Sequence, residues 1–134
     1  MATVLVVDDE FGIAELFVAI LADAGHRVLT ANNGRQGLAV LSQERADLVF
    51  LDCMMPVMDG AAMLAAMAAD PLLRAIPVAV MSAMSETAVA ERCSGYAGFI
   101  RKPFKVAQLV ALTERLLRTE HRPDQVAREN RPEA

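Results

Sequence analysis

A single carboxylate stands at the end of the most apolar stretch of the chain. Val49, Phe50 and Leu51 lead directly to Asp52, and Pro56 follows in the next loop. A short apolar run bounded by turn signals is typical of a strand buried on both faces of a parallel sheet. Ligand clefts in such sheets lie outside the carboxyl ends of the strands, so we expect Asp52 to belong to a site. Taken alone, it is equally compatible with a helix cap or a turn.

Three further short apolar runs also end on polar side chains. The first ends at Asp8 and Asp9, a later one at Ser82, and the last at Lys102. The carboxyl ends of parallel strands meet at one edge of a sheet, so these side chains are expected to converge there with Asp52.

This set of groups is suited to phosphoryl transfer, which needs a nucleophile, an in-line approach and neutralised charge on the phosphoryl oxygens. Asp52 is the candidate nucleophile. Its crowding with Asp8 and Asp9 requires a cation, because two like charges about 4 Å apart repel by roughly 4 kcal/mol at an effective dielectric near 20. Carboxylate oxygens favour Mg²⁺. Ser82 is a candidate hydrogen-bond donor and Lys102 a candidate point charge for phosphoryl oxygens.

The periodicity of apolar residues predicts which elements position these groups. The predicted strands cover residues 3–7, 26–31, 49–52, 78–81 and 97–101. The predicted helices cover residues 11–24, 35–43, 61–69, a short stretch from about 85, and about 106–117, and Gly25 supplies the end of the first. Five strand-then-helix units predict an α/β fold with a parallel sheet, since parallel neighbours need crossover connections.

Composition limits the other function classes. A chain of 134 residues with 54% hydrophobic and 22% charged residues fits one soluble domain. Its net charge of −4, without a basic patch in the body, argues against direct binding of nucleic acid and favours protein partners. No signal peptide or membrane-spanning run is visible, so we expect a cytoplasmic protein that does not bind membranes. Cys53 and Cys93 are too few for a disulfide framework or a zinc pattern and are expected to be reduced.

From Thr3 to about Leu117 the chain resembles the receiver domain of two-component response regulators, a family that includes the chemotaxis receivers. The matching motifs are Asp8-Asp9, Leu51-Asp52-Cys53-Met54-Met55-Pro56 with Asp59-Gly60, Met81-Ser82-Ala83, and Lys102-Pro103-Phe104. The resemblance implies a single-domain flavodoxin-like (βα)5 sandwich of three layers, with strand order 2-1-3-4-5. It places the receiver domain at residues 1–118 and leaves 119–134 as a polar tail or linker stump.

The same resemblance implies the function. A sensor histidine kinase or a histidine phosphotransfer protein would pass a phosphoryl group to Asp52 with Mg²⁺ as cofactor. The ion would be bound by Asp9, Asp52 and the backbone carbonyl of Met54, with Asp8 acting mainly through water. The bond between Lys102 and Pro103 would be a cis peptide that aims the lysine inward. Such a chain is a signalling protein that catalyses only its own phosphoryl transfer and autodephosphorylation.

The resemblance also implies a switch. Ser82, Ala83 and Lys102 would bind the phosphoryl group, and Phe99 would turn into the space that the Ser82 hydroxyl vacates. The surface formed by the helix from about 85, the strand 97–101 and the last helix would then repack for a downstream effector or a phosphorylation-dependent homodimer. A plain core role is the alternative for Phe99.

Two methionines stand where they could slow loss of the phosphoryl group. Met54 and Met84 match positions that flank the path of the attacking water in the family, and bulky apolar side chains there would slow hydrolysis. Simple packing is the alternative. An unchanged dephosphorylation rate in Met54→Asn would contradict the tuning role.

Two other classes use similar parts. A phosphohydrolase of the haloacid-dehalogenase type also uses a strand-end aspartate and Mg²⁺, but it needs an acid/base aspartate where this chain has Met54. A flavin-binding module needs a hydroxyl-rich phosphate loop after the first strand, where Asp8, Asp9 and Glu10 would repel the phosphate. We favour a stand-alone regulator, and a fragment of a longer regulator or hybrid kinase is the alternative.

Overall fold

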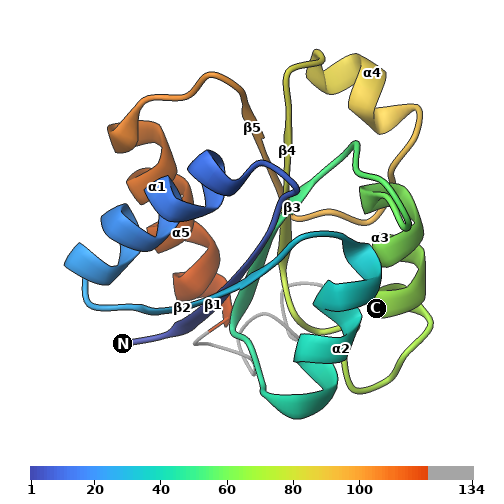
Figure 1. The fold of residues 1–134 in the computed structure, drawn as a ribbon, viewed down its shortest axis with the longest axis horizontal. Coiled ribbons are helices and arrows are strands. Elements are labelled where there is room, and N and C mark those ends of the chain that lie inside the picture. The colour runs from blue at the N-terminus through green and yellow to red at the C-terminus, as the bar shows by residue number, and fades with distance from the viewer. Residues whose placement is uncertain (121–134) are drawn as a thin grey trace, which may run out of the picture.

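The computed structural model describes residues 1–120 of the chain, with ten elements in strict alternation (Figure 1). The strands are β1 (Thr3–Val7), β2 (Arg27–Ala31), β3 (Leu48–Asp52), β4 (Val78–Ser82) and β5 (Gly98–Arg101). The helices are α1 (Phe11–Asp23), α2 (Gly34–Gln43), α3 (Gly60–Ala68), α4 (Glu86–Ala90) and α5 (Val106–Glu120). All ten match predicted elements to within a few residues.

The five strands form one parallel sheet in the order β2-β1-β3-β4-β5, which confirms the predicted fold class and strand order. The predicted site strand, β3, lies in the middle and pairs with β1 and β4. Every residue of β3 and β4 is buried, as the unbroken apolar runs predicted. The sheet therefore brings Asp52 to its carboxyl edge between the ends of β1 and β4.

Alternate residues of each strand build two separate cores. On β3, Val49 and Leu51 join the core beneath α2 and α3, whereas Leu48 and Phe50 join the core beneath α1 and α5. This alternation follows from the period of two along a strand. Figure 1 shows the result as three layers, with α1 and α5 on one face of the sheet and α2 and α3 on the other.

The loop after β3 is held close to the strand that it leaves. Asp59 caps α3 by accepting a hydrogen bond from the N–H of Ala62 at 2.9 Å. The N–H of Gly60 donates to the carbonyl oxygen of Cys53 at 3.0 Å. A Cβ atom at Gly60 would lie only 2.5 Å from the carbonyl oxygen of Asp52, so this approach requires glycine.

Val57, in the same loop, adopts a strained backbone conformation. Its φ is +70°, and the N–H of Met58 donates to the carbonyl oxygen of Pro56 at 2.8 Å, which defines a γ-turn with Val57 at its centre. The turn presents the Met58 carbonyl oxygen to the N–H of Gly34 at 2.9 Å, which links the loop to the start of α2. A β-branched residue in this region costs on the order of 1–3 kcal/mol.

Replacing Val57 with glycine is expected to stabilise the protein. The Val57 side chain is 74% exposed, so little packing is lost, and the backbone penalty disappears. After the extra entropy of glycine in the unfolded chain, we expect a net gain of about 1 kcal/mol in the free energy of unfolding, measured by urea denaturation. Val57→Ala is the control, because alanine keeps most of the penalty. An equal gain in both variants would contradict the role of φ.

The last helix is longer than predicted. Helix α5 continues to Glu120, about three residues past the predicted helix end at 117. The division of the chain at residue 118 stays a prediction, and the predicted tail beyond Glu120 lies outside the described residues. Within residues 1–120, no helix is long and apolar enough to cross a membrane.

Candidate functional site

A cleft of about 340 Å³ opens at the carboxyl edge of the sheet. Seven predicted site residues line it: Asp9, Asp52, Met54, Ser82, Ala83, Met84 and Lys102. They come from the ends of four strands and the loops that follow. The predicted convergence of polar strand ends is therefore present, and Glu10 joins the lining as a residue that was not predicted.

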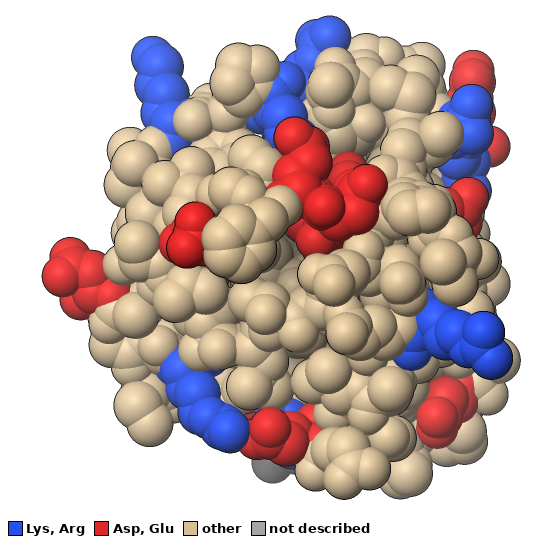
Figure 2. Space-filling view, viewed as in Figure 1, with Lys and Arg blue, Asp and Glu red and all other residues tan. Residues whose placement is uncertain are grey.

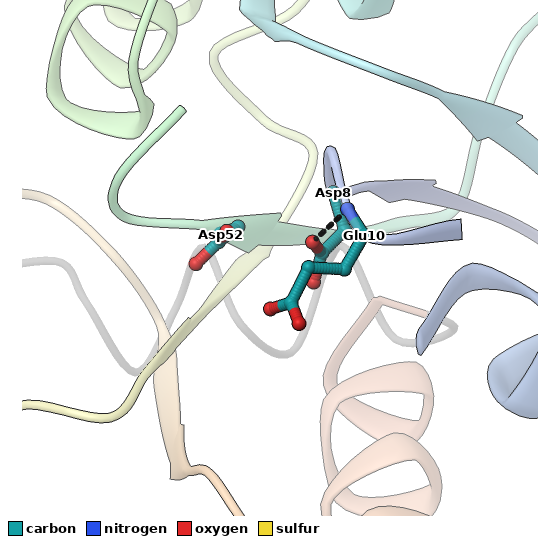
Figure 3. A group of neighbouring side chains, drawn as sticks. All are labelled: Asp8, Glu10 and Asp52. Atoms are coloured by element: carbon teal, nitrogen blue, oxygen red, sulfur yellow. Dashed lines mark hydrogen bonds between the residues drawn. The ribbon is translucent and has the colours of Figure 1, made fainter. Parts of the chain in front are cut away.

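Three carboxylates meet beside this cleft (Figure 3). Single oxygens of Asp8, Glu10 and Asp52 all lie within 4.8 Å of one another. Asp8 is anchored just past β1, because its N–H donates to the Ala31 carbonyl oxygen at 3.0 Å. Its own carboxylate accepts the N–H of Glu10 at 2.9 Å, drawn as the dashed line in Figure 3. This turn directs the Glu10 side chain back toward Asp52.

Lys102 is the cation of this cluster. Its Nζ atom lies 2.8 Å from Asp8 Oδ2, 3.2 Å from Glu10 Oε1 and 3.5 Å from Asp52 Oδ1. The Lys102 side chain is 13% exposed and that of Asp8 is fully buried. The peptide bond from Lys102 to Pro103 is cis, and the N–H of Lys102 donates to the Ser82 carbonyl oxygen at 2.8 Å. A single ammonium group thus faces three carboxylates.

Burial and the excess of negative charge shift the pKa values of Asp52 and Lys102. Burial raises the pKa of Asp52, and the neighbouring charge of Asp8 raises it further, to about 6, although Lys102 acts in the opposite direction. Burial lowers the pKa of Lys102, but its hydrogen bond to Asp8 and the charge of Asp52 outweigh that effect, so its pKa is raised. The lysine is therefore charged at neutral pH, and Asp52 is ionised there at a cost to stability.

Neutralising Asp52 is expected to stabilise the metal-free protein. Its carboxyl group binds a proton more tightly in the folded state than in the unfolded state, so the Asp52 contribution to the stability of the wild type falls as the pH rises from 3.8 through about 6. Asp52→Asn removes this penalty, and we expect its free energy of unfolding at pH 7.5 to exceed that of the wild type by about 1–2 kcal/mol. Denaturation in a chelator at several pH values measures the difference, which should vanish near pH 4. A difference independent of pH would contradict this cause.

The Ser82 hydroxyl is held by the loop beside the cleft. Ser82 Oγ accepts the N–H of Met84 at 3.0 Å, and the side chain is buried. One residue further on, the Ala83 carbonyl oxygen accepts a hydrogen bond from Arg101 Nε at 3.1 Å. The loop after β4 is thus connected both to the site and to the end of β5.

Phe99 lies outside the cleft lining. It is half-buried and packs against the core beneath α2 and α3, opposite Val80 in the register of β4 and β5. Because Ser82 follows Val80 by two residues, Ser82 and Phe99 lie on the same face of the sheet. Pro103 is exposed and also lies outside the lining.

The two methionines border the cleft differently. Met54 is 49% exposed at the rim, whereas Met84 is half-buried and packs against the core beneath α2 and α3. A role in slowing hydrolysis stays a prediction for both residues.

The structure gathers a different third carboxylate from the one predicted. Asp8 and Glu10, rather than Asp9, lie with Asp52 in the close cluster, and Asp9 is exposed on the cleft wall. The signal for Glu10 was present in the run Asp8-Asp9-Glu10, but the turn that brings its side chain back depends on the Asp8 hydrogen bond. Figure 2 shows acidic side chains gathered at this point of the surface.

The fold and the site together define a class: a parallel α/β protein whose acidic cleft at the carboxyl edge of the sheet contains an aspartate paired with a lysine. The family described as the response regulator receiver domain matches residues 4–114. The chain belongs to this family.

Solved structures and curated relatives agree with this assignment. A signal receiver domain of a histidine kinase from Syntrophus aciditrophicus is 33% identical with a TM-score of 0.81, covering 87% of this chain and 90% of that one. Chemotaxis protein CheY4 of Vibrio cholerae is 30% identical with a TM-score of 0.80, covering 87% and 99%. The DNA-binding response regulator MtrA of Mycobacterium tuberculosis is 34% identical over 123 residues, or 90% of this chain and 53% of MtrA.

The chain spans about half the length of such curated relatives. The comparisons place it in two-component signalling and give no support to the hydrolase alternative.

Proposed function

We propose that this chain is a phosphorylation-dependent receiver in which Asp52 accepts a phosphoryl group from a phosphohistidine. One observation carries the proposal: a buried aspartate faces a cleft with a lysine ammonium 3.5 Å from its carboxylate. The Asp52 oxygen attacks phosphorus, the phosphorus–nitrogen bond of the donor breaks, and the imidazole leaves with the bonding electron pair.

The residues around Asp52 are suited to the charge of the product. Lys102 can move from its carboxylate partners to a phosphoryl oxygen, because its side chain ends at the cleft. The Ser82 hydroxyl can donate to a second oxygen, and Ala83 lines the cleft beside it. Each contact places a positive or donor group where negative charge accumulates.

The donor set fits Mg²⁺. Three carboxylates within 4.8 Å offer the hard oxygen ligands that this ion prefers. Asp8, Glu10 and Asp52 would hold it, and Asp9 and the Met54 carbonyl stay candidate ligands from the sequence. When bound, the ion supplies positive charge that neutralises the carboxylates and the phosphoryl oxygens.

The hydrogen bond at Ser82 supports a switch through the loop after β4. If the hydroxyl moves to a phosphoryl oxygen, the N–H of Met84 loses its acceptor and the loop must rearrange. Phe99 lies on the same face of the sheet and can follow the movement. We propose that this repacks the α4–β5–α5 surface.

The partners follow from this role. We propose a sensor histidine kinase or a histidine phosphotransfer protein as donor and a protein effector or a second copy of the chain as output. MtrA is described as DNA-binding and is about twice as long as this chain. That this chain does not bind nucleic acid directly stays a prediction. A cytoplasmic location stays a prediction.

The decisive experiment is the intact mass after incubation with acetyl phosphate. We expect one phosphoryl adduct that requires Mg²⁺. The adduct should not form when a chelator is added before the phosphodonor. Asp52→Asn should give no adduct. Asp59→Asn is the matched control, because Asp59 caps α3 and lies outside the cleft lining, and it should be labelled like the wild type. Labelling of Asp52→Asn, or none in the wild type, would overturn the proposal.

A further inference from the structure

The fold brings together two cysteines that the phosphoacceptor chemistry does not use. Cys53 and Cys93 are 40 positions apart, yet their Sγ atoms lie 3.8 Å apart and share a hydrogen bond. Both are free thiols, buried in the core beneath α2 and α3. They are the only two cysteines of the chain. A disulfide needs a sulfur–sulfur distance of about 2.05 Å, so the pair lies less than about 2 Å from bonding distance.

The two cysteines are anchored unequally. Cys53 directly follows Asp52, and its backbone is fixed on both sides: its N–H donates to the Met81 carbonyl oxygen at 3.0 Å, and its carbonyl oxygen accepts the N–H of Gly60 at 3.0 Å. Any movement of Cys53 therefore involves the phosphoacceptor strand and the start of α3.

Cys93 lies outside the sheet, in the segment between α4 and β5. It follows α4, a helix of five residues whose buried residue is Val89, and its N–H donates to the Val89 carbonyl oxygen at 2.8 Å. Arg92, Ser94 and Gly95 beside it are exposed, and a Cβ at Gly95 would meet no atom within 4 Å. Cys93 Sγ can therefore move toward Cys53 Sγ without movement of a strand. In Figure 1, α4 stands above the sheet at the upper right.

We propose that Cys53 and Cys93 are a redox modification site, which forms a reversible intramolecular disulfide and ties the segment after α4 to the phosphoacceptor strand. The chemical partner is a small thiol oxidant, such as glutathione disulfide. The bond converts an adjustable contact between the two segments into a covalent one.

The reaction with glutathione disulfide balances as two thiol–disulfide exchanges. The segment after α4 must first open, because burial and the neighbouring Cys53 thiol raise the pKa of Cys93 to about 12. The exposed Cys93 then loses its proton and attacks one sulfur of glutathione disulfide, so a mixed disulfide forms and the first glutathione leaves. Cys53 loses its proton and attacks the Cys93 sulfur, so the protein disulfide forms and the second glutathione leaves. The cysteine pair is oxidised by two electrons, and glutathione disulfide is reduced to two thiols that take up the protons. Excess reduced glutathione reverses both steps.

The consequence for signalling rests on the proposed function. The segment from Cys93 to Ala97 lies between α4 and β5, within the surface that we propose to repack after phosphorylation. A covalent bond to the neighbour of Asp52 would hold this segment in its unphosphorylated position. The oxidised chain would therefore be a receiver whose output surface no longer responds.

The chain carries a reporter in this segment. Tyr96 is its single tyrosine, and there is no tryptophan, so intrinsic fluorescence reports on Tyr96 alone. Tyr96 is half-buried against the core that holds both cysteines. Acetyl phosphate with Mg²⁺ should change its emission in the reduced protein and leave it unchanged in the oxidised protein.

The test is an equilibration of the native full chain in glutathione redox buffers, followed by alkylation and intact mass. We expect the wild type to lose two hydrogen atoms without gaining glutathione, to stay monomeric, and to melt about 5–10 °C higher when oxidised. Cys53→Ser and Cys93→Ser are the controls and should retain one thiol or one glutathione adduct. Mixed disulfides, linked dimers or two unreacted thiols in the wild type would overturn the proposal.

The outcome separates this inference from the proposed function. Disulfide formation is measured without any phosphodonor, and phosphoryl labelling is measured on the reduced protein. A disulfide without labelling supports the redox site and contradicts the receiver chemistry. Phosphoryl labelling without a disulfide supports the receiver chemistry and contradicts the redox site. A disulfide that leaves the Tyr96 response intact would contradict the proposed lock on the output surface.

Discussion

Lys102→Met is expected to destabilise the metal-free protein by about 3 kcal/mol at pH 7.5. The substitution keeps an unbranched apolar stem and removes the ammonium group that lies among Asp8, Glu10 and Asp52. Asp8 is fully buried, so its charge has no water to replace the lysine. Removing one partner of a buried ion pair leaves an uncompensated charge, which is costlier than the pair is stabilising.

Two further measurements identify the cause of that loss. The loss should shrink as the pH falls through about 6, because Asp52 becomes protonated and one of the three negative charges disappears. It should also shrink on addition of Mg²⁺, since the ion and the lysine would compete for the same oxygens. Urea denaturation with chelator and with Mg²⁺ gives both comparisons. We therefore expect Mg²⁺ to bind Lys102→Met more tightly than the wild type.

Glu10→Gln is the matched control for Lys102→Met. It also breaks a contact with Lys102 Nζ, but the Glu10 side chain is 64% exposed. An exposed ion pair contributes little, so we expect a change of no more than about 0.5 kcal/mol. Equal losses in the two variants, or a loss in Lys102→Met that Mg²⁺ does not reduce, would contradict burial of the Asp8 charge as the cause.

Gly60→Ala is expected to cost about 3 kcal/mol or more in the free energy of unfolding. The new Cβ would lie 2.5 Å from the Asp52 carbonyl oxygen and 3.0 Å from Cys53 Cα. Both are backbone atoms, which cannot rotate away as a flexible side chain can. The start of α3 must therefore move away from β3, with loss of the hydrogen bond from Gly60 to Cys53.

Gly60→Ala would also disturb the candidate site, because the carbonyl oxygen that the new Cβ meets belongs to Asp52. Gly12→Ala is the control: Gly12 lies in α1, and a Cβ there would meet no atom within 4 Å. We expect that variant to be more stable by about 0.5–1 kcal/mol, because alanine favours a helix. Urea denaturation measures both variants. A loss below about 1 kcal/mol in Gly60→Ala would contradict the close approach.

The sequence was sufficient for the architecture and for the edge of the sheet that carries the site. The unbroken apolar runs ending at Asp52 and Ser82 predicted buried parallel strands, and parallel strands ending on polar groups predicted one cleft. These features depend on local periodicity and on connection rules, which a sequence displays directly. Among the seven predicted lining residues, Asp9, Asp52, Ser82 and Lys102 follow from these rules. The other three, Met54, Ala83 and Met84, were expected from the resemblance to receiver domains.

The features that escaped prediction depend on contacts between distant segments or on backbone geometry. Glu10 joins Asp52 through a turn closed by Asp8, which residue types alone do not reveal. Cys93 reaches Cys53 because of the path that the chain takes after a short helix. The positive φ of Val57 is opposed by its own β-branched side chain, so local preference pointed away from it.

The strained turn at Val57 has a practical consequence for the study of this chain. Single domains have a free energy of unfolding of only about 5–15 kcal/mol, so a destabilising substitution at the cleft can bring the protein close to unfolding. Val57 is exposed and lies outside the cleft lining, so Val57→Gly would raise the free energy of unfolding and leave the cleft residues unchanged. In that background, Lys102→Met and Gly60→Ala would stay folded over a wider range of conditions. A loss of labelling could then be attributed to the missing group and not to unfolding.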